Sequence, residues 1–290
     1  MRPLNRLLSA FATGIVLLSG SSWALAPATV EVVQAPAWVD RDGRSLPLTP
    51  GMELKSGDLV RTGNGARAYL MLAEGSRVKL GEAARFSLHT RSMRPEKSFH
   101  GALDVIAGAF RFTTAKLKKS VPRELAIRVG TATIGIRGTD VWGKTDKDGD
   151  LVALLEGKIE ITRGGQSTEL AQAMTYYDAP AGKGAEVKAL DLELFARLAR
   201  QTDIIAGDGA ADTKGKWTIV AGSSESQGTA LEIYDQVRDA GFAGRVRTRT
   251  VEGGGWRYEV LVGRYANAAE AEVASARLKA TTELKPTVTR

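Results

Sequence analysis

Alternation of apolar and polar residues with a period of two is the strongest pattern in this sequence, and it runs from about Val30 to Asp178. Side chains of a β-strand point alternately to its two faces, so such runs predict strands with one buried face. The alternating apolar residues are Ala68, Leu70 and Leu72; Val78 and Leu80; Phe86 and Leu88; Phe110 and Phe112; and Leu125, Ile127 and Val129. Turn dipeptides with glycine at the second position separate several runs, at Asn64-Gly65, Glu74-Gly75 and Asp148-Gly149. The pattern predicts an all-β domain of many short strands over residues 30–178.

Residues 216–290 contain an internal repeat, which predicts a second domain. At a constant offset, Ile219, Ala221, Gly222, Ala230, Ile233 and Val237 correspond to Val260, Val262, Gly263, Ala271, Ala274 and Leu278. Each half reads as a strand, a glycine turn, an amphipathic helix and a further strand. Gly241 ends the first helix, and Asn267 with Glu270 forms the capping box of the second. The order βαββαβ predicts an α+β domain, a four-stranded antiparallel sheet with two helices on one face and the other face open.

Residues 179–215 are rich in Ala, Gly, Lys and Asp, and we interpret them as a helix-containing linker. Leu190, Leu194 and Leu198 share one helical face. We expect this face to dock on a neighbouring domain, with a partner-binding helix as the alternative. The glycines at 207, 209 and 215 are expected to loosen the chain after the helix.

The N-terminus has the order of an export signal over residues 1–26. Arg2 and Arg6 precede an apolar run, and small residues follow it. A cleaved signal peptide predicts a periplasmic protein, and an uncleaved anchor is the alternative because residues 7–26 are just long enough to span a bilayer. No later segment is expected to cross a membrane.

Composition excludes several chemistries. The sequence contains no cysteine, so disulfides and thiolate sites are ruled out. Its formal charge of +7 is spread along the chain without a dense basic block, and we therefore predict no nucleic-acid partner.

No catalytic or metal-binding constellation is apparent. His89 and His100 are the only histidines, and no G-x-S-x-G motif accompanies them. The aspartates in the stretch 146–150 resemble the start of a calcium loop, but Leu151 and Gly157 occupy the positions that require glycine and a carboxylate. We predict a protein without enzyme activity, metal or cofactor.

The stretch TATIGIRGTDVWG (131–143) is the most conspicuous loop-like motif. Gly135 and Gly138 indicate a bulge or a close backbone approach, and Arg137 and Asp140 are placed to pair locally. We interpret the motif as structural, because no second group of matching chemistry lies nearby.

The β-region resembles the FecR family of exported domains from about Pro50 to Tyr177. The matching pieces are LKSGDLVRTGNGARAYLMLAEGSRVKLGE (54–82), GAFRF (108–112), ATIGIRGTDVWG (132–143) and LLEGKIEI (154–161). The resemblance implies that the Arg-Gly-Thr-Asp stretch belongs to the fold. Well-known members relay an outer-membrane signal to a cytoplasmic sigma factor. Only about six residues precede the apolar run here, so no sigma-binding segment is expected.

The C-terminal region resembles the SPOR (sporulation-related) domain. The matching pieces are WTIVAGSS (217–224), DAGF (239–242), YEVLVGRYANAAEAE (258–272) and ARLKA (276–280). The resemblance implies binding of peptidoglycan, typically glycan strands stripped of stem peptides, on the open face of the sheet.

Strand parity predicts which side chains line that face. If Ile219, Ala221, Val260 and Val262 face the helices, their alternating neighbours face outward. The glycan- or partner-binding candidates are Thr218, Val220, Arg247, Arg249, Trp256, Glu259 and Leu261. The family usually has glutamine at 220, an aromatic at 224 and arginine-like residues at 259 and 261, and this sequence differs at all four. Trp256, Tyr258 and Tyr265 are aromatic residues that could compensate, with core packing as the alternative for the tyrosines.

These observations support two hypotheses. The first is a non-catalytic envelope protein, septal or peripheral, that binds peptidoglycan through its SPOR-like domain and presents its FecR-like domain to another envelope protein or as a scaffold. The alternative is a periplasmic sensor or regulator of envelope signalling in which both domains bind proteins.

Overall fold

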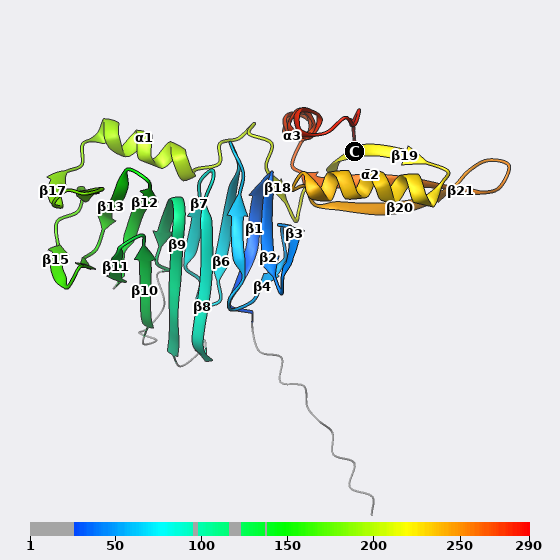
Figure 1. Ribbon diagram of the computed structural model, residues 1–290. Coiled ribbons are helices and arrows are strands. Elements are labelled where there is room, and N and C mark those ends of the chain that lie inside the picture. The colour runs from blue at the N-terminus through cyan, green and yellow to red at the C-terminus, as the bar shows by residue number, and fades with distance from the viewer. Residues whose placement is uncertain (1–25, 95–97, 116–122, 137) are drawn as a thin grey trace, which may run out of the picture.

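The computed structural model describes residues 26–94, 98–115, 123–136 and 138–290, which form a β-sandwich followed by a smaller α+β domain (Figure 1). The expected signal peptide therefore lies almost wholly outside the described residues. Both predicted fold classes are confirmed.

The N-terminal domain consists of two sheets that share one long strand. The first sheet has the order β1 (Ala28–Gln34), β6 (Arg67–Leu72), β7 (Arg77–Leu80), β9 (Ser98–Thr113), β12 (Asp140–Asp146), β13 (Gly149–Glu156), β16 (Thr175–Pro180) and β17 (Glu186–Ala189), with β4 (Glu53–Leu54) also paired to β1. The second has the order β3 (Arg44–Pro47), β2 (Ala37–Arg41), β5 (Leu59–Thr62), β8 (Arg85–Arg94), β9, β10 (Arg123–Val129), β11 (Ala132–Ile136), β14 (Ile159–Arg163) and β15 (Gln166–Leu170). All these pairs are antiparallel except β9–β10, which is parallel.

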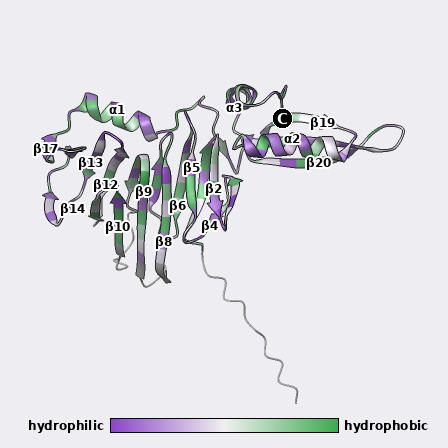
Figure 2. Ribbon diagram, in the orientation of Figure 1, coloured by the Kyte–Doolittle hydropathy of each residue, from purple (hydrophilic) through white to green (hydrophobic). Residues whose placement is uncertain are grey.

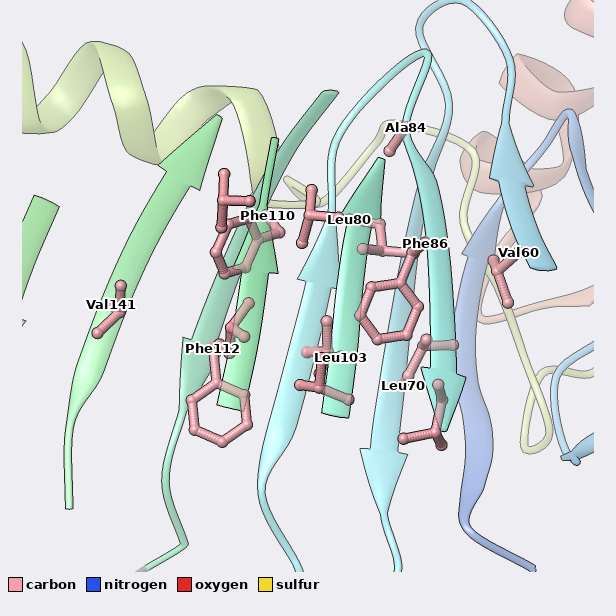
Figure 3. Close-up of a cluster of buried hydrophobic side chains, with 14 of the residues drawn as sticks. Val60, Leu70, Leu80, Ala84, Phe86, Leu103, Phe110, Phe112 and Val141 are labelled. Atoms are coloured by element: carbon pink, nitrogen blue, oxygen red, sulfur yellow. The ribbon is translucent and has the colours of Figure 1, made fainter. Parts of the chain in front are cut away.

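The apolar residues of the period-two pattern form the core of this domain. In β6, for example, Ala68, Leu70 and Leu72 are at most 1% exposed, whereas the residues between them are half-buried. Phe86, Phe110 and other large side chains from both sheets gather in one cluster (Figure 3). Burial of each such side chain contributes about 1.5 to 3 kcal/mol, so this cluster dominates the stability of the domain.

Strand β9 passes from one sheet to the other at Gly108. Its residues before Gly108 pair with β8 and β10, and its last residues pair with β7 and β12. Gly108 has φ +85°, and a Cβ there would lie 2.6 Å from the Cα of Ala84. Only glycine satisfies both the left-handed backbone and this close approach.

The helix of the linker covers the outer face of the first sheet. Helix α1 (Leu192–Thr202) begins after the N-cap Asp191, whose carboxylate accepts a hydrogen bond from Leu194 N. Leu190 and Leu198 are buried against Trp142 and other first-sheet residues. Figure 2 shows hydrophobic and hydrophilic residues alternating along this helix. The leucine-bearing face thus packs on the N-terminal domain, as expected.

The C-terminal domain has the predicted βαββαβ order. Its elements are β19 (Trp217–Ser224), α2 (Gln227–Asp239), β20 (Gly244–Thr250), β21 (Trp256–Tyr265), α3 (Ala268–Thr281) and β22 (Thr287–Thr289). The strands are antiparallel in the order β22-β19-β21-β20. Ile219, Ala230, Val260 and Leu278 are completely buried in a core between the sheet and the two helices.

The segment after α1 is held firmly, contrary to the expectation that its glycines loosen it. Strand β18 (Ala211–Asp212) pairs with β1 on one side and with β21 on the other, so the two domains share a continuous sheet. A Cβ on Gly209 would lie 2.9 Å from Ala274 N, and one on Gly215 would lie 2.4 Å from Tyr265 N. These glycines serve close packing rather than flexibility.

Glu270 holds the same segment from the C-terminal domain. Its carboxylate is buried and accepts hydrogen bonds from the backbone N–H groups of Gly207 (2.6 Å), Gly209 (2.6 Å) and Ala210 (3.1 Å). Asn267 caps α3 as predicted, since its side chain accepts from Glu270 N. The Glu270 side chain was predicted to be the reciprocal partner in a capping box, but it accepts its hydrogen bonds from the linker instead.

Candidate functional site

The predicted site is the face of the C-terminal sheet opposite its two helices. Ile219, Ala221, Val260 and Val262 are buried in the helix-side core, as the parity argument expected. A register shift between Val220 and Gly222 accommodates Ala221 as a bulged residue. The remaining residues of the alternation therefore point to the outer face.

Register places these outer-face residues in rows across three strands. Val220, Leu261 and Arg245 form one row, and Ser223, Glu259 and Arg247 form the next. In the third row Arg257 lies opposite Arg249.

Four arginines and two carboxylates determine the electrostatics of this face. Arg247 donates to Glu259 Oε2 from Nε (2.9 Å) and Nη2 (2.5 Å), and Arg249 Nε lies 3.1 Å from the same oxygen. Arg257 pairs with Glu225 at 3.2 Å. Arg245 is exposed, and the described part of the chain offers it no ion-pair or hydrogen-bond partner. We call these four arginines the arginine strip; it is cationic and solvent-facing, suited to anionic or hydroxyl-rich ligands.

Two predicted contact residues are not available for binding in the manner expected. Leu261 is 0% exposed, although its pairing with Val220 and Arg245 places it on the outer face. Thr218 is 8% exposed, and its hydroxyl donates to the Gly263 carbonyl at 3.0 Å. Leu261 keeps the outward parity that was predicted for it, but its buried side chain offers no contact surface.

The aromatic candidates lie on the other side of the sheet. Trp256 lies on the same face of β21 as Tyr258, Val260 and Val262. Its side chain is 56% exposed, because it lies next to the glycine turn at 253–255 and outside the buried core. Tyr258 and Tyr265 pack against the helix-side core, where burial raises the pKa of the Tyr265 hydroxyl. The core alternative for the tyrosines is therefore confirmed, and Trp256 does not join the arginine strip.

The linker helix leaves this face free. Helix α1 packs on the N-terminal domain, and the hydrogen bonds between domains use other surfaces. Arg277 of α3 donates to the carbonyls of Ala35 (3.3 Å) and Gly65 (3.1 Å), and Ala37 N donates to Gly241 O (3.1 Å). At the Arg245 end, an opening of about 270 Å³ separates the sheet from the loop containing Thr49 and Pro50.

Sequence reasoning omitted Arg245 and Arg257 from the binding candidates. Both are cationic members of the outer face. The sequence contained the information needed to include Arg257, because alternate residues of a strand share a face. Arg257, and not Trp256, lies two positions before Glu259.

The other motifs of the sequence have structural roles. Gly138 has φ +67°, consistent with a turn, whereas Gly135 lies in regular β11 pairing without a bulge or close approach, contrary to expectation. Arg137 lies outside the described residues. Asp140 is bound by Arg111 through two hydrogen bonds of 2.9 and 2.7 Å, so its partner comes from β9.

The aspartates of the stretch 146–150 do not converge. Asp150 is buried and accepts from the hydroxyls of Thr131 (2.7 Å) and Thr145 (2.6 Å). Asp146 binds Lys144, whose ammonium lowers the pKa of this carboxyl. Asp148 occupies the hairpin between β12 and β13, as the Asp-Gly dipeptide predicted.

Together, the fold and this face define a two-domain protein in which a β-sandwich is followed by a βαββαβ domain with a basic outer sheet face. Residues 58–160 match the family model described as FecR protein, and residues 213–290 match that of the SPOR domain. The chain therefore contains a FecR domain followed by a SPOR domain, as the sequence motifs indicated. Both families are non-catalytic, and the SPOR domain implies peptidoglycan binding.

Comparison with solved structures finds two crystal structures of a proposed anti-sigma factor from Parabacteroides distasonis, at 1.65 and 2.50 Å resolution. Each is 13% identical to this chain with a TM-score of 0.38. The alignments cover 67% and 72% of this chain, and 95% and 99% of the respective structures. Among curated proteins, none matches. In the described part of the chain, no helix has the length and apolar character needed to cross a membrane.

Proposed function

We propose that this protein is an exported, non-catalytic cell-envelope protein that binds peptidoglycan through the outer face of its C-terminal sheet. In this proposal the N-terminal domain presents a surface for another envelope protein or acts as a scaffold. The observation that carries the proposal is the arginine strip on an open sheet face of a SPOR domain.

The chemistry of the strip suits a glycan strand without stem peptides. Such a strand carries free lactyl carboxylates along with its hydroxyl and amide groups. Guanidinium groups donate several hydrogen bonds in a fixed plane and form charge-assisted bonds with carboxylates. Arg245 and Arg249 are exposed, and Glu259 holds Arg247 and Arg249 in place. The strip therefore supplies oriented donors at successive rows of the sheet.

Sedimentation with purified sacculi tests the proposal. The mature chain is expected to co-sediment with sacculi, more strongly after an amidase has removed stem peptides. Replacing Arg245 and Arg249 together by alanine is expected to weaken binding about tenfold, the value for loss of about 1.4 kcal/mol. Arg44→Ala in β3 is the matched control, because this arginine is also exposed and lies on the other domain. If the mature chain stays in the supernatant with both kinds of sacculi, the proposal is wrong.

A second candidate function is a periplasmic sensor or regulator in which both domains bind proteins. It is favoured by the side-chain composition of the strip, because none of the outer-face residues named above is aromatic, and sugars are commonly recognised by stacking. Site-specific cross-linking from Ser223 in cells discriminates the two, since a protein adduct supports the regulator and a glycan adduct supports the tether. Septal enrichment of a fluorescent fusion would support recognition of the wall.

A further inference from the structure

A large hollow lies on the N-terminal domain, away from the arginine strip. It encloses about 1050 Å³ beside the strands β8, β9, β10, β11 and β14 of the second sheet. Leu103, Ile127 and Ile134 of these strands face the sandwich core and are at most 1% exposed. Because side chains alternate along a strand, the residues between them line the outer face of the sheet, where the hollow opens.

The floor of the hollow consists of very small residues. Ala102, Ala126 and Gly135 lie side by side on β9, β10 and β11, since Ala102 pairs with Ala126 and Ala126 pairs with Gly135. A Cβ on Gly135 would have no neighbour closer than 4.0 Å, and its φ lies outside the left-handed region. The fold therefore does not require glycine here. Its effect is to keep the floor low between taller side chains.

One wall of the hollow is acidic. Glu160 and Glu169 are exposed and lie directly opposite each other on β14 and β15. Lys158 Nζ lies 2.6 Å from Glu169, whereas Glu160 has no ion-pair or hydrogen-bond partner among the described residues. Like charges directly opposite across two strands are destabilising. A second cation, supplied from outside, would relieve this repulsion.

The opposite wall has a different charge arrangement. Arg128 binds the Asp104 carboxylate from Nε and Nη2, and His89 Nε2 lies 3.3 Å from Asp104 Oδ2. Ser87 Oγ is also 3.2 Å from His89 Nε2. His100 lines the same hollow, so both histidines of the sequence meet here. This wall offers donors and a guanidinium, suited to backbone carbonyls or an acidic group.

We propose that this hollow binds an extended segment of a partner polypeptide, oriented with a lysine or arginine between Glu160 and Glu169. Successive pairings connect His89, Ala102, Ala126, Gly135 and Glu160 in one row across the sheet. This row crosses four strand spacings, or about 19 Å, which matches the length of about six residues of extended chain. The backbone N–H and C=O groups of the central strands β9, β10 and β11 already pair with neighbouring strands on both sides. The partner segment would therefore be recognised by the side chains that surround the low floor. The inference rests on the protein-binding role proposed for the N-terminal domain and names the chemistry of its partner.

Other ligand classes fit less well. None of the residues that line the hollow is a tryptophan, tyrosine or phenylalanine, the side chains best suited to stack on sugars. Glu160 and Glu169 repel nucleic acids and anionic lipid headgroups. An extended peptide with a basic side chain matches both the acidic wall and the low floor of small residues.

A positional-scanning library of acetylated hexapeptide amides provides the probe, with binding to the mature chain measured by fluorescence polarisation. We expect peptides with a fixed lysine or arginine near one end to bind at least tenfold more tightly than those with glutamine or glutamate. Glu160→Gln combined with Glu169→Gln is expected to abolish this preference. Gly135→Leu is expected to block binding by filling the floor, whereas Gly184→Leu, at a glycine with no atom within 4 Å of its Cβ position, is the control.

The outcomes separate this inference from wall binding. Gly135→Leu should co-sediment with sacculi as the unmodified chain does, and its circular dichroism and unfolding midpoint should be unchanged. Absence of a basic preference, or binding that survives Gly135→Leu in a folded variant, would overturn the inference. Displacement of bound peptide by chitooligosaccharides would overturn it in favour of a sugar ligand. Failure of the chain to sediment with sacculi would contradict only the proposed wall-binding function.

Discussion

Buried charge at the domain junction is the residue-scale feature with the largest expected effect. Glu270 receives three backbone hydrogen bonds from the linker while remaining only 8% exposed. Glu270→Ala leaves these N–H groups without their charged acceptor, and we expect a loss of about 3 kcal/mol in the free energy of unfolding. Urea titration followed by circular dichroism measures it. Glu272→Ala, on the exposed side of the same helix, serves as the control; equal effects of the two changes would contradict the assignment.

A second residue-scale prediction concerns acid stability. Arg61 binds Asp40 and holds the pKa of that carboxyl below its ordinary value of 3.8. A lowered folded-state pKa stabilises the fold above the unfolded pKa, and this stabilisation is lost as pH falls through the folded pKa. Asp40→Asn is therefore expected to cost about 0.5 to 1 kcal/mol near neutral pH, since the pair is partly exposed. The cost should shrink below about pH 4.

Unfolding free energies at several pH values check this expectation. In an Arg61→Gln background, the pH dependence of the Asp40→Asn effect should become smaller, because the group that contributes most to lowering the Asp40 pKa is gone. A cost that stays constant down to about pH 3 would show that the carboxyl charge is not responsible.

At the scale of elements, the two glycines at 108 and 135 should respond oppositely to alanine. Gly108 enables β9 to change sheets at positive φ, with Ala84 in close contact. Gly108→Ala should therefore destabilise by about 3 kcal/mol or more, whereas Gly135→Ala should lie within about 0.5 kcal/mol of the unmodified chain. Thermal and urea unfolding of both variants decide the matter. A large loss of unfolding free energy in Gly135→Ala would contradict the expectation that the open surroundings of Gly135 tolerate a side chain.

Elements were predictable where their pattern is local. Alternation identified the core positions of β6 and β7, and the repeat identified every element of the C-terminal domain. The crossing of β9 between sheets, the two-residue strand β18 and the burial of Leu261 depend on pairings between distant segments. No local period encodes these pairings. The floor glycine Gly135 likewise resembled a bulge in sequence, because only the register shows that nothing approaches it.

At the scale of the whole molecule, the short linker strand joins the two domains that carry the proposed binding surfaces. β18 continues the first sheet into the C-terminal sheet, and Arg277 and Glu270 reinforce the junction from α3. Figure 1 shows the C-terminal domain extending from the end of the sandwich formed by β1, β2 and β3. A protein held on the wall by its arginine strip would therefore present the hollow of its N-terminal domain at a defined position relative to the wall.

This rigidity can be measured directly because the chain contains no cysteine, so two introduced cysteines take spin labels selectively. Thr162 and Leu231 are exposed positions on different domains. Labels at these positions should give one narrow distance distribution in electron double resonance. Adding Glu270→Ala and Arg277→Ala should broaden it, since both changes remove hydrogen bonds that cross the junction. Glu272→Ala combined with Lys279→Ala is the control, because both of these α3 side chains are exposed. A broad distribution in the otherwise unmodified chain would mean that the domains move independently and that wall binding does not orient the hollow.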